Sequence, residues 1–128
     1  MSVISQLLNQ DTSCIDIIEL MFGLSPLESL MYFHLLQDGE KTVAQLCEDS
    51  FRKQTTVHLA LQNLVSRGIC NKKKRNKIPR GYEYLYSAFK PSVVQKILKE
   101  RLERLYACTS KCIAEFGTKA LFCEINFN

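Results

Sequence analysis

Hydrophobic positions recur at helical spacing through the first half of the chain. The first such segment is TSCIDIIELMF, residues 12–22. Asp11 or Thr12 can cap its start, and Gly23, which accepts a left-handed backbone, can end it. The pattern therefore predicts an amphipathic helix over residues 12–22.

A second helical segment, residues 25–38, has a complete set of start and stop signals. Ser25 and Glu28 have capping-box spacing, Pro26 occupies the first helical position, and Gly39 follows the segment. Its apolar stripe contains Leu27, Leu30, Met31, His34 and Leu35, widened by Tyr32 and Phe33. We expect this helix to lie at the centre of the core, with His34 as a packed histidine rather than a ligand or a base.

Two shorter helical patterns follow, separated by a tight turn around Ser50 and Phe51. Thr42 can cap the first, in which Val43, Leu46 and Cys47 have the spacing of two helical turns. The second covers residues 53–67, and Gly68 ends it. Its apolar face is formed by Val57, Leu61, Leu64 and Val65. A short helix, a tight turn and a second helix predict a helix-turn-helix.

After Gly68 the period changes from helical to alternating. ICNKKK and YEYLYSAF are typical of two strands, and Pro79 and Gly81 mark the turn between them. Tyr82, Tyr84 and Tyr86 alternate, so they share one face of the second strand, which we expect to pack on the helical core. A hairpin directly after a helix-turn-helix predicts a winged helix.

From Pro91 onward the pattern is helical again, for about 25 residues or roughly 37 Å, until Gly117. Spacings of four and three residues form a coiled-coil-like seam of Leu98, Leu102, Leu105, Thr109, Cys112 and Phe116. A second copy of the helix is the simplest cover for this seam. We therefore expect a mainly α protein with a two-stranded β-wing: a winged helix-turn-helix with an N-terminal helical lead in residues 1–90, and a dimerisation helix and tail in residues 91–128.

Composition places the chain among cytoplasmic globular proteins. Its 46% hydrophobic content is ordinary, no apolar run reaches the length of a membrane span, and the first residues lack a signal peptide. The six cysteines are then expected to be reduced thiols, most of them core filler. Residues Cys108 and Cys112 leave three interpretations open, namely core packing, redox sensing and an intersubunit metal site, and no resident cofactor or metal is expected.

Charge is distributed unevenly. Residues 1–49 carry eight acids and one Lys, whereas residues 50–82 carry nine Lys or Arg and no acid. A patch of a single sign is typical of a polyanion site. The predicted DNA-binding residues are Arg52, Lys53, Gln54, Thr55, Thr56, His58 and Gln62 on the second helix, and Lys72, Lys73, Lys74, Arg75, Lys77 and Arg80 on the wing.

These residue types suit the two kinds of contact that proteins make with duplex DNA. Short polar side chains and amides can bond base edges, and the wing cations suit phosphate contacts or minor-groove insertion. Two alternatives stay open: a protein-interaction adaptor, and a single-stranded RNA binder suggested by RGYEYLY. We find no catalytic constellation, so we do not expect an enzyme.

The stretch TVAQLCEDSFRKQTTVHLALQNLVSRGICNKKKRN, followed by RGYEYLYSAF, resembles archaeal winged-helix transcriptional regulators of the TrmB/MarR-like type. The resemblance covers about residues 20–90. It implies a homodimer on duplex DNA, with Thr55, Thr56 and His58 at the base-facing start of the recognition helix and residues 72–80 in the wing.

The chain departs from this family pattern in two ways. It lacks the large sugar-binding C-terminal domain of TrmB proteins and the helices that enclose a ligand pocket in MarR proteins, so neither a sugar nor a phenolic effector is expected. Some small archaeal regulators recruit a general transcription initiation factor. By analogy, the acidic N-terminal third is a candidate surface for such a contact.

Overall fold

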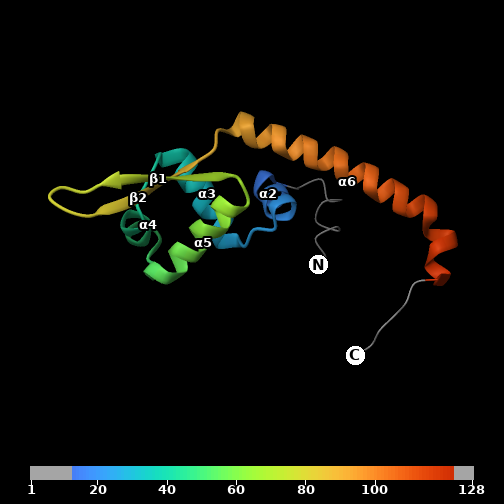
Figure 1. The fold of residues 1–128 in the computed structure, drawn as a ribbon, viewed down its shortest axis with the longest axis horizontal. Coiled ribbons are helices and arrows are strands. Elements are labelled where there is room, and N and C mark those ends of the chain that lie inside the picture. Colours follow the sequence, from blue (N-terminus) through green and yellow to red (C-terminus); the bar gives the residue numbers. More distant parts are fainter. Residues whose placement is uncertain (1–12, 123–128) are drawn as a thin grey trace, which may run out of the picture. The chain divides into compact units, whose positions relative to one another are not determined.

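The computed structural model describes residues 13–122, and the chain divides into two compact units, Met1–Val94 and Gln95–Asn128. In order, the elements are the helices α2 (Cys14–Phe22), α3 (Pro26–Asp38), α4 (Val43–Ser50) and α5 (Gln54–Ser66), the strands β1 (Cys70–Asn76) and β2 (Tyr82–Ala88), the helix α6 (Pro91–Lys119) and the 3-10 turn η1 (Ala120–Phe122) (Figure 1). The expected fold class is confirmed: the protein is mainly α, with a two-stranded antiparallel wing and a long C-terminal helix. Among residues 13–122, no helix has both the length and the hydropathy that crossing a bilayer requires.

The helix starts follow side-chain capping. At α2 the cap is Ser13, so the prediction of Asp11 or Thr12, which lie outside the described residues, was wrong. The Ser13 hydroxyl accepts the Asp16 N–H at 3.3 Å, and the Asp16 carboxylate accepts the Ser13 N–H at 3.1 Å. Gly23 ends the helix with a φ of 67°, as predicted.

The start of α3 is confirmed, because Ser25 and Glu28 form the expected reciprocal capping box and Gly39 follows the helix. Thr42 is the N-cap of α4, as predicted, and it also forms a capping box with Gln45. Each of these caps satisfies backbone N–H groups that the first helical turn leaves unpaired.

Helix α3 lies at the centre of the core, but it buries only part of the predicted stripe. Its buried residues are Ser29, Met31, Tyr32 and Leu35. The Tyr32 hydroxyl donates to the Phe89 carbonyl at 3.3 Å, and burial raises its pKa to about 12. Leu30 is 58% exposed, because it lines an open groove of about 720 Å³ between α2, α3 and α4 instead of facing α5.

The wing is one antiparallel hairpin whose register runs from the pair Cys70 and Ala88 to the pair Asn76 and Tyr82. Its tip closes through the Lys77 N–H, which donates to the Gly81 carbonyl at 2.9 Å. Its base is held by Lys41, whose backbone exchanges two hydrogen bonds with Tyr86, at 3.0 and 2.8 Å. The hairpin thereby extends beyond the helices that support its base (Figure 1).

The prediction that all three wing tyrosines pack on the core was wrong for two of them. Tyr86 is 1% exposed, but Tyr82 is 56% exposed and Tyr84 is only partly buried. Strand alternation assigns all three to one face, yet only the base of the hairpin reaches the helices. Distance along the hairpin therefore decides which tyrosine is buried.

Helix α6 starts at Pro91 and continues to Lys119, so the prediction that Gly117 ends it was wrong. Beyond Gly117, the Thr118 hydroxyl still donates to the Glu115 carbonyl, and Lys119 pairs with the Glu115 carboxylate at 2.7 Å. The first compact unit ends at Val94, which is buried, and the second begins at the next residue. The functional division between residues 90 and 91 stays a prediction.

Most described cysteines are not core filler, which corrects the expectation from composition. Cys70 is buried, and burial raises the pKa of its thiol to about 12. Cys47 is partly buried, whereas Cys14, Cys108 and Cys112 are exposed. Cys108 and Cys112 are therefore not buried within their own unit, and Cys123 lies outside the described residues. Within the described part of the chain, no three metal-binding side chains gather into a cluster.

Candidate nucleic-acid interface

The outward face of α5 is the first part of the candidate interface. Val57, Ala60, Leu61 and Leu64 are buried on the opposite face. At roughly 100° per residue, the centre of the outward face is a ridge of residues spaced four, three and four apart. This ridge contains Thr55, Leu59, Gln62 and Ser66, all exposed.

Four of the predicted α5 residues lie on or beside this ridge, and Gln54 is exposed at the first turn of the helix. Thr55 and Gln62 lie on it, His58 flanks one side and Thr56 the other. Every predicted DNA-binding residue, on the helix and on the wing, is exposed. Leu59 was missed because apolar periodicity assigns leucines to the buried side, although its spacing from Thr55 and Gln62 places it on this ridge.

The turn between α4 and α5 sets the start of the outward face. Phe51 adopts a left-handed backbone with a φ of 56°, which is uncommon for an aromatic residue. Its side chain is 94% exposed. Arg52 and Lys53 follow it, and Lys53 is the N-cap of α5 with an extended backbone. The turn therefore places two cations at the N-terminus of the candidate recognition helix.

A network of ionisable side chains connects α3 to α4. His34 lies with Nε2 2.9 Å from the Asp49 carboxylate and Nδ1 3.4 Å from that of Asp38. Lys41 pairs with Asp49 and, at 3.5 Å, with Asp38. The hydrogen bond from Lys41, followed by that from His34, lowers the pKa of Asp49. The expectation that His34 is packed in the core was therefore wrong, because it lies in this partly exposed network.

The cations on the two faces of the wing make different contacts. On the face of the tyrosines, the Lys72 ammonium lies 4.6 Å from the centre of the Tyr84 ring, and the Lys74 ammonium lies 4.2 Å from that of Tyr82. These cation–π contacts hold two cations close to the strand while leaving them exposed.

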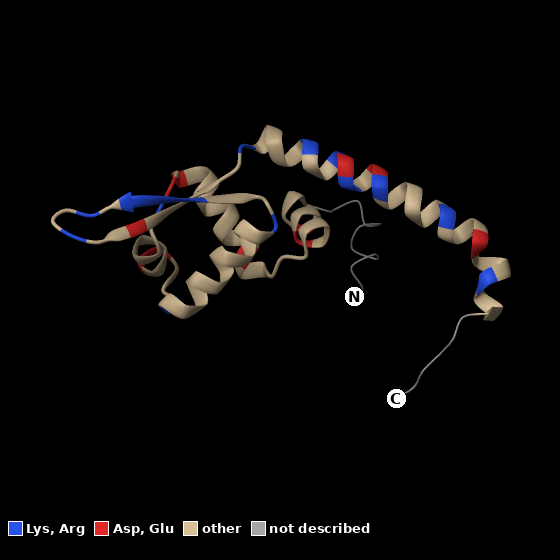
Figure 2. Cartoon of the chain, in the orientation of Figure 1, with Lys and Arg blue, Asp and Glu red and all other residues tan. Residues whose placement is uncertain are grey.

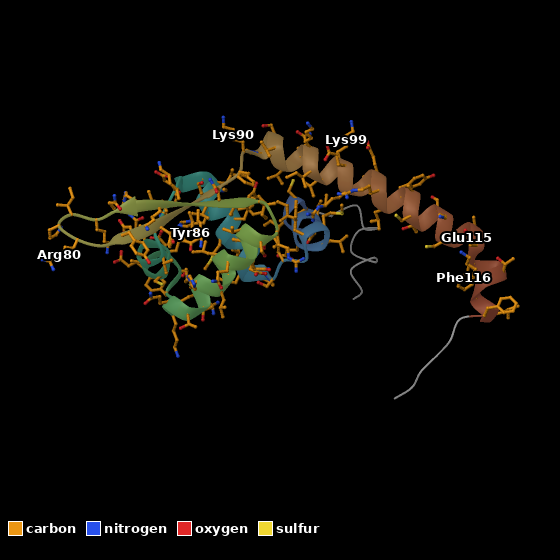
Figure 3. All side chains as sticks on the ribbon, viewed as in Figure 1. Arg80, Tyr86, Lys90, Lys99, Glu115 and Phe116 are labelled. Atoms are coloured by element: carbon orange, nitrogen blue, oxygen red, sulfur yellow. The ribbon has the colours of Figure 1, made fainter. Side chains whose placement is uncertain are left out.

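On the other face, the Arg75 guanidinium pairs with the Glu83 carboxylate, to which its Nε donates at 3.1 Å. Lys77 lies 3.9 Å from the same carboxylate. The hydrogen bond from Arg75 lowers the pKa of Glu83, so this acid stays charged and offsets part of the positive field. Basic positions nevertheless dominate β1 and the hairpin tip (Figure 2), and Arg80 points outward at that tip (Figure 3).

Helix α6 forms a separate apolar surface. Its exposed large hydrophobic residues include Leu102, Leu105, Tyr106, Ile113 and Phe116, each more than half exposed. Leu102, Leu105 and Phe116 belong to the predicted seam, and Tyr106 and Ile113 widen it at four-residue spacing. Among the described residues of this helix, only Val94 is buried.

Comparison with known proteins identifies relatives along most of the chain. The family model described as sugar-specific transcriptional regulator TrmB matches residues 18–92. The protein MJ1082 of Methanocaldococcus jannaschii is 33% identical over 102 residues, which cover 79% of this chain and 83% of the relative. A second protein of that organism, MJ1503, is 31% identical over 83 residues, covering 65% of this chain and 63% of its own.

Two solved archaeal structures share the fold. A possible transcriptional regulator from Methanosarcina mazei Go1 has a TM-score of 0.72 at 16% identity, covering 79% of this chain and 86% of its own. The ST1889 protein of Sulfolobus tokodaii has a TM-score of 0.58 at 18% identity, covering 85% of this chain and 99% of its own. At these identities the similarity supports the fold alone.

The family match contains α3, α4, α5 and both wing strands, and it spans more than half of the chain. The predicted resemblance to TrmB-type regulators is thereby confirmed. The prediction that the chain is not an enzyme is confirmed as well, because the family is one of transcriptional regulators. The chain belongs to the TrmB family of transcriptional regulators.

Proposed function

We propose that the protein binds specific sites on duplex DNA as a homodimer and regulates transcription in the cytoplasm. The observation that carries this proposal is the acid-free exposed face of α5, which leads through the chain into a strongly basic wing. Polar side chains on an exposed helix suit base edges in the major groove, and basic side chains on a projecting hairpin suit phosphates.

The chemistry of α5 supports direct base readout. The Gln62 amide can form paired hydrogen bonds with an adenine, and the His58 imidazole and the Thr55 hydroxyl add shorter donors and acceptors. Arg52 and Lys53, at the helix start, can bond guanine or neutralise a phosphate. We therefore assign sequence selection to α5.

The chemistry of the wing supports affinity rather than selection. Lys72, Lys73 and Lys74 are exposed on β1, and Arg80 lies at the hairpin tip. Each phosphate that such a cation neutralises releases counterions, so binding should weaken as salt rises.

Dimerisation is assigned to α6. An apolar stripe that is more than half exposed in one chain is costly in water, and a second copy of the same stripe can cover it. A twofold dimer would present two α5 helices to half-sites separated by about one DNA turn or a multiple of it. By analogy with small archaeal regulators, we also assign contact with a general transcription initiation factor to the acidic N-terminal third.

The test is a fluorescence-anisotropy titration of the full chain with three probes: the duplex upstream of its own gene, a scrambled duplex and a single-stranded RNA. We expect at least about tenfold tighter binding to the native duplex than to the scrambled one at about 150 mM salt. The variants His58→Ala and Gln62→Ala should lose that preference. The matched control Gln37→Ala removes the same amide as Gln62→Ala from an exposed position on α3 and should keep it.

Other outcomes would contradict the proposal in distinguishable ways. Preference for the RNA, lost on changing Tyr82 or Tyr84, would indicate a single-strand binder. No binding to any duplex at about 50 mM salt, where phosphate contacts are strongest, would indicate a protein-interaction module. Equal binding to both duplexes would indicate a nonspecific DNA-binding protein.

A further inference from the structure

Leu59 lies where a DNA-reading helix ordinarily carries polar side chains. It is 59% exposed, although leucine is among the residues most often buried. Its neighbours on the outward ridge are Thr55, four residues before it, and Gln62, three residues after it. The core face of α5 is complete without it, because Val57, Ala60, Leu61 and Leu64 fill that face.

We propose that Leu59 is a specificity-determining residue that packs against the 5-methyl group of a thymine in the major groove. This inference rests on the proposed function, since it requires α5 to enter that groove. In the major groove the only apolar group on a base edge is the thymine methyl, and apolar side chains are its natural partners.

The neighbours of Leu59 make the choice of base more specific. Side chains three and four residues apart on a helix have Cβ atoms about 5–6 Å from each other, so Leu59 and Gln62 would contact the same or adjacent base pairs. An adenine bonded by Gln62 presents its thymine partner, and its methyl, in the same groove. The three ridge residues Thr55, Leu59 and Gln62 together therefore favour A·T pairs over G·C pairs at their contact.

The molecule contains a matched control for the apolar contact. Leu30 on α3 is 58% exposed, nearly the same as Leu59, but it lines the groove between α2, α3 and α4 and is not part of α5. A general effect of removing an exposed leucine would appear in Leu30→Ala as well. An effect on thymine recognition would appear only at Leu59.

The experiment begins by selecting bound sequences from a random duplex pool with the full chain. Each thymine of the selected site is then replaced by deoxyuridine, which lacks only the methyl group. At one thymine in each half-site, the replacement should raise the Kd of the wild type and of Leu30→Ala about fourfold, as expected for one buried methyl. Because the homodimer loses this contact in both half-sites, Leu59→Ala should bind the thymine duplex about sixteenfold more weakly and lose little more with deoxyuridine. Leu59→Gln, which keeps the side-chain length, serves as the second variant, and thermal unfolding should show both variants folded.

Two results would overturn the inference, and they separate it from the proposed function. If a site is selected but every deoxyuridine penalty is the same in wild type and Leu59 variants, Leu59 does not read a methyl, although the DNA-binding function stands. If no duplex is selected, the proposed function itself fails, and Leu59 becomes a contact for another class of partner.

Discussion

Three tyrosines on one strand face have two kinds of surroundings. Tyr86 is enclosed at the base of the hairpin, where burial raises its pKa, whereas Tyr84 and Tyr82 lie beneath the ammonium groups of Lys72 and Lys74. The same residue type therefore serves packing at one end of the strand and cation placement at the other. Substitutions along the strand should separate the two roles.

Tyr86→Ala should lower the free energy of unfolding by about 3 kcal/mol or more, since it removes a large buried side chain. Tyr82→Ala should cost less than about 1 kcal/mol, because an exposed cation–π contact contributes little to stability. Urea unfolding followed by circular dichroism measures both. Equal losses at the two positions would mean that Tyr82 is packed in the native state.

The carboxylate of Asp49 gives the fold a defined response to acid. Its pKa in the folded protein lies below the ordinary value of 3.8, chiefly because of the hydrogen bond from Lys41. Its contribution to stability is therefore present above that value and is lost as the pH falls through the folded-state pKa.

Asp49→Asn should consequently lower the urea midpoint at pH 7, and the difference from the wild type should shrink toward about pH 2. The control Glu48→Gln removes the same charge from an exposed neighbour on α4 and should shift the midpoint less. A difference that stays constant with pH would show that Asp49 acts through packing rather than through its charge.

In the proposed complex with duplex DNA, helix α5 and the wing have different roles. Helix α5 presents a face without acids, whereas the wing presents cations of which Arg75 and Lys77 are already close to Glu83. The exposed lysines of β1 are then the strongest source of sequence-independent attraction.

Replacing Lys72, Lys73 and Lys74 together by Gln should weaken binding to native and scrambled duplexes alike. The slope of log K against log salt should fall by about 0.9 for each phosphate contact that is lost. The control replaces the exposed Lys96, Lys99 and Lys111 of α6 by Gln, which changes the net charge equally (Figure 3 labels Lys99). An unchanged slope in the wing variant would remove the wing from the DNA interface.

At the scale of the whole molecule, the apolar stripe of α6 is exposed, and we expect a second copy of the chain to cover it. Leu102→Glu with Leu105→Glu should convert a dimer of about twice 14.7 kDa into a monomer of 14.7 kDa in light scattering. The control Lys111→Glu lies on the opposite side of helix α6 from Leu102, and this variant should remain dimeric. A monomeric wild type would contradict the assignment of α6.

A twofold dimer also constrains the spacing of its DNA sites. Inserting about five base pairs between the half-sites turns them to opposite sides of the duplex and should reduce affinity to the level of one half-site, whereas inserting about ten should restore much of it. Anisotropy with the two spacer duplexes measures this. Equal affinity for both would indicate that each protomer binds alone.

The sequence by itself determined the features that depend on near neighbours along the chain. The capping box at Ser25, the N-cap at Thr42, the helix stop at Gly23 and the hairpin between the two strands were all predictable, because caps and turns satisfy backbone groups within a few residues. The basic segment was equally visible, since charge is a property of composition.

Tertiary structure decided which side chains meet solvent. Leu30 fits helical periodicity, yet it is more than half exposed, because burial requires a neighbouring element on that side. His34 was expected in the core, but it contacts the carboxylates of Asp38 and Asp49. The packing of α3 and α4 brings Asp49 to it. The spacing of Leu59 already turns it away from the core face of α5, but the assembled fold decides that it is 59% exposed there, because exposure is a property of the assembled fold and not of the local chain.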